Sequence, residues 1–154
     1  MKKESSLSAS KGAPAVHPLA RVLRNFEELR KAYDLAFEDQ TLKAVLHKMI
    51  DRLDLYEKIV AQVLQPEEFH ALYEANAFTD MDKPPVFELY KRVMIANREV
   101  LRAVIKNDEK DLIATIDYTH REIIAITPEI LVLVSKMKES WTKISKKGNV
   151  GYVG

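Results

Sequence analysis

LKAVLHKMIDRLDLYEKIVAQVL, residues 42–64, carries apolar side chains at every third or fourth position. Those positions are Leu42, Val45, Met49, Leu53, Tyr56, Val60 and Val63. On an α-helix this spacing forms a single apolar stripe, which is typical of a helix packed on a core by one face. No Gly or Pro interrupts the chain between Pro18 and Pro66. The stretch therefore predicts a long helix with one buried side.

The residues before this helix are also expected to be helical. Pro18 suits the first turn of a helix, because its missing N–H is not needed there. Residues 18–64 form either one helix or two helices that meet near residues 38–41. We favour the break, with Asp39 as the candidate N-cap of the second helix.

The same periodicity continues to the C-terminal end. A short helix follows Pro66, and a third long helix is expected to bury Phe87, Tyr90, Val93, Met94, Leu101, Val104 and Ile105. Asn107 and Asp108 break the pattern before a helix over residues 109–126. Thr127-Pro128 is typical of a cap and a first-turn proline, so a last helix is predicted from residue 128 to about 146. Its expected apolar face is Leu131, Val134, Met137, Trp141 and Ile144.

These segments predict an all-α protein, a helical bundle of about four long helices with short loops. The 154 residues suffice for one domain, and the four Gly and six Pro residues are too few for a β-sandwich or barrel. We divide the chain into an extended basic arm (1–17), a helical bundle domain (18–147) and a short C-terminal tail (148–154). Without Cys, disulfides and thiolate chemistry are excluded. No apolar run reaches the length of about 18 residues that a membrane span needs.

Charge is segregated along the chain, although the total is only +1. Residues 1–31 hold seven basic and three acidic residues, and residues 134–154 hold five basic residues and one acidic residue, so each end carries +4. The part between them carries 12 basic and 19 acidic residues, a net charge of −7. Basic ends on an acidic body indicate an anionic partner for the ends. Basic ends that only keep a soluble protein dispersed remain the alternative.

The candidate DNA-facing helix, residues 18–38, has a basic edge. At 100° per residue, Arg21, Arg24 and Lys31 lie opposite the apolar stripe that runs from Leu19 to Tyr33. An ordinary solvated face is the alternative interpretation. Together with the arm, this edge forms a series of long cations that suits phosphate contact without base reading. The candidate DNA-binding residues are Lys2, Lys3, Lys11, Arg21, Arg24, Lys31, Lys143, Lys146 and Lys147.

In layout the chain resembles the major coat proteins of rod-shaped and filamentous viruses of hyperthermophilic archaea. The similarity lies in its size, in a Ser/Ala/Lys arm that leads through prolines into a helix, and in the ending Gly151-Tyr152-Val153-Gly154. This resemblance implies a non-enzymatic virion protein whose N-terminal arm and helix wrap double-stranded DNA and whose body packs with copies of itself or a related coat subunit. It assigns the phosphate contacts to the arm lysines and to Arg21, Arg24 and Lys31, and it leaves open a membrane envelope.

A small-molecule or metal-binding helical bundle is the alternative function. Residues 98–120 resemble the effector-binding domain of FadR-type bacterial regulators, which carries a His-based metal site, but Asn97 stands where that family has a His. Glu67 and His70, like Asp117 and His120, have the spacing of half a ferritin-like di-iron site. The sequence lacks the other ligands in matching positions, so we expect no metal, no cofactor and no catalytic residues.

Overall fold

The structure, a computed structural model, describes the backbone of residues 16–147 and the side chains of residues 16–143. Every regular element in this part of the chain is helical, which confirms the all-α class. The elements are the 3₁₀ turn η1 (Pro18–Arg21), α2 (Phe26–Ala32), α3 (Leu42–Leu64), α4 (Phe69–Ala75), α5 (Lys83–Lys106) and α6 (Glu109–Lys147).

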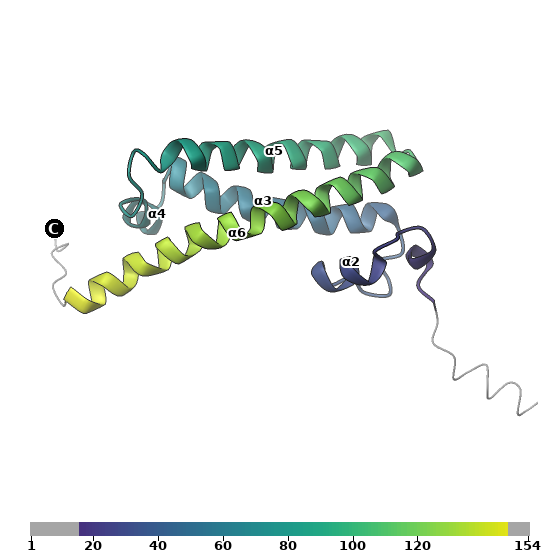
Figure 1. Ribbon diagram of the computed structural model, residues 1–154, viewed down its shortest axis with the longest axis horizontal. Coiled ribbons are helices and arrows are strands. Elements are labelled where there is room, and N and C mark those ends of the chain that lie inside the picture. Colours follow the sequence, from purple (N-terminus) through teal and green to yellow (C-terminus); the bar gives the residue numbers. More distant parts are fainter. Residues whose placement is uncertain (1–15, 148–154) are drawn as a thin grey trace, which may run out of the picture.

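The three long helices α3, α5 and α6 pack on one another around a shared core (Figure 1). The short elements η1 and α2 lie at one end of this bundle, and α4 lies at the other. The predicted stripe of α3 is confirmed, since six of its seven residues are buried and Leu42 is partly buried. Among the described residues, α3, α5 and α6 supply the long helices of the expected bundle.

α6 is one helix of 39 residues, so the predicted break at Thr127-Pro128 is wrong. The Thr127 hydroxyl does not cap a new helix but donates to the Ile123 carbonyl one turn earlier, at 2.7 Å. A proline inside a helix costs about 3 kcal/mol. The core isoleucines Ile123, Ile126 and Ile130 lie on both sides of it, and each contributes about 1.5–3 kcal/mol when buried. The free energy gained by burying these three isoleucines exceeds the cost of the proline, so the helix continues through it.

The buried faces of α5 and of the second half of α6 differ from those expected. In α5, Val93 is buried and Tyr90 and Val104 are partly buried, as expected, whereas Phe87, Leu101 and Ile105 are exposed. The other buried residues of α5 are Val86, Leu89, Ala96, Asn97, Val100 and Ala103. In α6, Met137 is buried as expected, but Leu131, Val134 and Trp141 are exposed and Ile130 and Leu133 are buried instead. Ile144, the last residue of the expected face, lies outside the side chains described. The inward face of α5 includes Ala96 and Ala103, whose small side chains let helices approach closely. Large apolar side chains such as Phe87 therefore lie outside the packed face, and the predicted stripe is wrong at those positions.

Residues 18–38 do not form one helix. η1 ends at Arg21, α2 begins at Phe26, and Asp34 has a left-handed backbone (φ 51°) that ends the segment. The N-cap of α3 is Thr41, whose Oγ1 accepts from the Ala44 N–H at 3.0 Å. Asp39 was the wrong candidate, because its carboxylate accepts from the Ala36 N–H inside the preceding turn.

Candidate nucleic-acid interface

Residues 17–33 form a short segment that is packed against the end of the bundle by its apolar side. Packing begins at His17, the last residue of the expected arm, which is buried and stacks on Phe26 with ring centroids 4.6 Å apart. The His17 Nδ1 atom accepts from the Leu19 N–H at 3.1 Å and so caps η1. Further along, Leu19, Leu23, Phe26 and Leu29 are all buried in the core. The segment is therefore a fixed part of the fold.

The opposite side of this segment carries the three described cations of the predicted DNA-binding set. Arg21, Arg24 and Lys31 are all exposed, as the periodicity predicts, although they come from η1, the turn after it and α2 and not from one helix. Within residues 16–143, no ion pair engages any of the three. Arg24 also lines a surface hollow of about 450 Å³ between the segment and the start of α6.

Both acidic residues of the segment are engaged within the protein. Residues 18–31 contain four basic residues and the two acids Glu27 and Glu28. Glu27 pairs with Arg30 at 3.3 Å, and Glu28 turns toward α6, where it contacts His120. Neither acid therefore pairs with Arg21, Arg24 or Lys31.

A buried polar network holds the segment in place, and the sequence analysis did not anticipate it. His120 of α6 is 4% exposed; its Nε2 atom lies 3.0 Å from a Glu28 carboxylate oxygen and its Nδ1 atom 2.7 Å from the Tyr33 hydroxyl. When Glu28 is ionised, Nε2–H donates to it, and Nδ1 accepts from the Tyr33 O–H. Burial raises the pKa of Tyr33, with the Arg52 guanidinium above its ring acting in the opposite direction.

Tyr33 thus keeps its proton and stays a donor across the ordinary pH range. Arg52 also donates to the Ala32 carbonyl at 3.1 Å, which fixes the last residue of α2 on α3. The network is a structural connection between α2, α3 and α6. A signal was present in the sequence, since His120 follows Ile116 and precedes Ile123 at core spacing.

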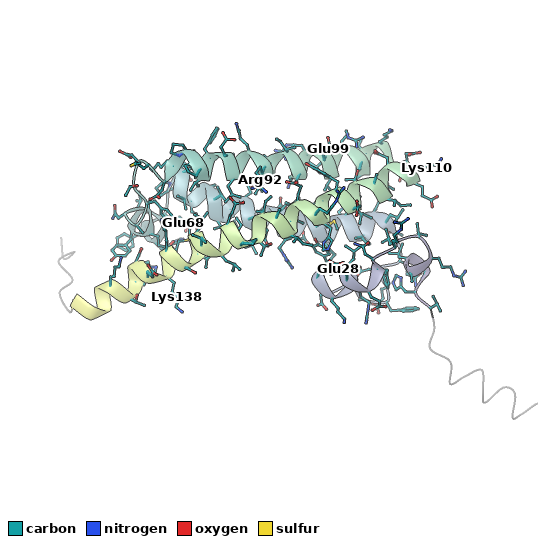
Figure 2. The ribbon with its side chains drawn as sticks, in the orientation of Figure 1. Glu28, Glu68, Arg92, Glu99, Lys110 and Lys138 are labelled. Atoms are coloured by element: carbon teal, nitrogen blue, oxygen red, sulfur yellow. The ribbon has the colours of Figure 1, made fainter. Side chains whose placement is uncertain are left out.

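At the other end, the last third of α6 is held by α4. The Trp141 ring stacks on Tyr73 at 4.6 Å, and its indole N–H donates to Glu74 at 2.7 Å. Lys143 is exposed just beyond this contact. Figure 2 shows Lys138 on this part of α6 and Glu28 on α2, at opposite ends of the molecule. The structure therefore does not bring Lys143 together with Arg21, Arg24 and Lys31.

The other candidate residues lie outside the part described. Lys2, Lys3 and Lys11 precede residue 16, and the side chains of Lys146 and Lys147 follow residue 143. Their assignment rests on the sequence alone.

Neither carboxylate–histidine pair is joined by the further ligands of a di-iron site within the described residues. The imidazole of His70 pairs with the neighbouring Glu68 at 3.3 Å, and both side chains are exposed. His120 is engaged by Glu28 and Tyr33, while Asp117 pairs with Arg121 at 3.0 Å. Over residues 16–143, no three His, Asp or Glu side chains converge as a metal-binding group. No helix of the described chain is both long and apolar enough to span a bilayer.

Comparison with known proteins adds no relative: no family model, no curated protein and no solved structure matches this chain.

Proposed function

We propose that this chain is a structural protein that binds double-stranded DNA through its phosphates and packs with copies of itself, as the coat of a helical virion does. The observation that carries the proposal is the segment of residues 17–33. It is fixed to the bundle by one side and presents Arg21, Arg24 and Lys31 on the other, while its own acids are engaged internally.

The chemistry of these residues favours phosphates over bases. Exposed Arg and Lys side chains contact the DNA backbone without reading its sequence. Three such contacts per subunit are weak alone, but a coat repeats them along one polymer, and linked weak contacts add up to strong binding. The acidic middle of the chain, with its net charge of −7, repels DNA and restricts it to the basic ends.

A binding assay with matched charge variants tests the proposal. Fluorescence anisotropy measures affinity for labelled duplexes of two unrelated sequences at several salt concentrations. The double variant Arg21→Glu, Arg24→Glu is expected to weaken binding to both duplexes at least tenfold. The control, Lys58→Glu with Lys91→Glu, makes the same charge change at exposed positions on the body and is expected to have a much smaller effect.

A second experiment removes residues 1–15 and keeps His17, so that its stacking on Phe26 is retained. The truncated chain is expected to fold, as measured by circular dichroism, but to lose filament formation with duplex DNA in electron micrographs. Wild-type protection of DNA from nuclease by the truncated chain would show that the arm is not a DNA contact. Equal losses in the two charge variants would show that residues 17–33 form no specific interface.

A further inference from the structure

The middle of α6 has an unusual composition. From Ile123 to Ser135 the sequence reads IIAITPEILVLVS, and Glu129 is its only charged residue. An α-helix that is apolar on all sides is normally enclosed on all sides. α6 is not enclosed here: Ile124 is 52% exposed, Leu131 59%, Val132 57% and Val134 40%.

The two acids beside and within this stretch face away from the exposed apolar side, whereas the exposed Arg121 and Lys138 bound that side one turn before and one turn after it. Arg92 of α5 lies 2.6 Å from a Glu129 carboxylate oxygen and 3.9 Å from a Glu122 oxygen, so both acids lie along the α5 side. The core side is formed by Ile126, Ile130 and Leu133. The remaining side, which we call the bare face, consists of Ile124, Ala125, Pro128, Leu131, Val132, Val134 and Ser135 and carries no charge.

Neighbouring elements bracket the bare face without covering it. The segment of residues 17–33 contacts α6 nearer its start, at His120, and α4 contacts it nearer its end, at Trp141. In Figure 1 the middle of α6 crosses between α2 and α4, in front of α3. A contiguous exposed apolar patch with polar surroundings marks an interaction surface.

The charge along α6 identifies the occupant. Residues 108–117 hold four acidic residues and one basic residue, a net charge of −3. Residues 136–147 hold five basic residues and one acidic residue, a net charge of +4. A second α6 in antiparallel orientation places the acidic start of each copy on the side of the basic end of the other. Complementary charge of this kind steers encounter and sets orientation.

We propose that the bare face binds the bare face of a second copy, with the two α6 helices crossing antiparallel about a two-fold axis near Pro128. Such an interface is self-complementary, and it buries the charge-free face of both subunits at once. A crossing of about 50° is the commonest packing of helices in globular proteins and directs the second helix between α2 and α4. The inference rests on the proposed function only in that copies pack together, and it needs no DNA.

Association is tested by sedimentation velocity of the full chain without DNA. One helix crossing buries less than the roughly 800 Å² per partner of a standard interface, so we expect a weak dimer in the micromolar range. Leu131→Glu places a charge at the centre of the bare face and is expected to weaken association at least tenfold. Leu55→Glu is the control, because Leu55 is 53% exposed on α3, close to the value for Leu131.

Orientation is tested by cysteine cross-linking, which is clean because the chain has no cysteine of its own. Pro128→Cys lies near the proposed axis and is expected to form a disulfide-linked dimer under mild oxidation. Thr142→Cys lies 14 residues away, so its two copies are about 40 Å apart in an antiparallel pair and are not expected to link.

A monomeric wild type, or equal association of the two Leu→Glu variants, would overturn the bare face as an interface. Efficient linking through Thr142→Cys but not Pro128→Cys would overturn the antiparallel crossing. If the Leu131→Glu variant is monomeric but still binds DNA, the proposed phosphate contacts do not depend on the dimer, and the two proposals are tested separately.

Discussion

The imidazole of His120 joins two side chains that precede it by 92 and 87 positions, the carboxylate of Glu28 at 3.0 Å and the hydroxyl of Tyr33 at 2.7 Å. A single buried residue of α6 thus fixes both α2 and the residue that ends it. This contact determines where the neighbouring cations point, because Arg24 and Lys31 lie on the same short segment. The orientation of the basic surface depends on a polar contact inside the protein.

Replacing His120 by leucine is expected to destabilise the protein by about 2–3 kcal/mol, since the Tyr33 hydroxyl is left buried without its partner. Urea unfolding measures the loss, and limited proteolysis between residues 33 and 41 is expected to become faster as α2 loosens. His70→Leu serves as the control at an exposed position and is expected to change stability by less than about 0.5 kcal/mol. Equal stability of the two variants would contradict the role of the network.

Tyr33 predicts a loss of stability at alkaline pH. Burial raises the pKa of its hydroxyl in the folded state; the Arg52 guanidinium acts in the opposite direction, and the Glu28 carboxylate adds to the rise. The unfolded chain releases this proton near pH 10, so the contribution is complete below about pH 10 and is lost as the pH rises above it. Urea unfolding between pH 8 and 11 is expected to show a shallower decline for Tyr33→Phe than for the wild type. Parallel curves would show that Tyr33 ionises as easily in the folded state as in the unfolded one.

Asn107 ends α5 in the left-handed region, with φ 57° and ψ 40°. Alanine is strained in this conformation, whereas glycine adopts it freely. Asn107→Ala is expected to lower the free energy of unfolding by about 1 kcal/mol, and Asn107→Gly is expected to change it by less than about 0.5 kcal/mol. Thermal unfolding of both variants gives the comparison, and a lower melting temperature for the glycine variant than for the alanine variant would contradict the backbone explanation.

The salt dependence of DNA binding gives a measure of how many phosphates Arg21, Arg24 and Lys31 contact. Each contact contributes about 0.9 to the slope of log K against log salt concentration on duplex DNA. Replacing all three residues by alanine is therefore expected to reduce the slope by about 2.7. Binding of the wild type and the triple variant is measured at salt concentrations from roughly 50 to 300 mM, a range over which the slope can be determined. An unchanged slope would place the phosphate contacts elsewhere on the chain.

The helical class and the buried stripe of α3 followed from periodicity alone, because α3 has one strongly apolar side. Periodicity was right only in part for α5, where the predicted Val93 is buried but Phe87 lies outside and Ala96 and Ala103 lie inside. At Thr127-Pro128 the error came from the cap and proline signal, which was overridden by the burial of isoleucines on both sides. Close helix approach and long-range burial are tertiary properties, and a single sequence does not display them.

The candidate site was predicted in part for the same reason. The exposure of Arg21, Arg24 and Lys31 follows from their place opposite an apolar stripe, even though the stripe belongs to two short elements. The partner of His120 did not follow, because Glu28 lies 92 positions away in the sequence. Pairing across such a distance depends on how α2 packs on α6.

The continuity of α6 through Pro128 has a mechanical consequence. His120 grips the N-terminal segment, and Lys143 lies 23 residues further along the same rod, a rise of about 35 Å. A helix of this kind neither stretches nor folds back, so the interval between the two ends of the molecule stays constant. If subunits bind along DNA through both ends, the fixed length of α6 would set the axial spacing between their contacts, and with it the repeat distance of the filament.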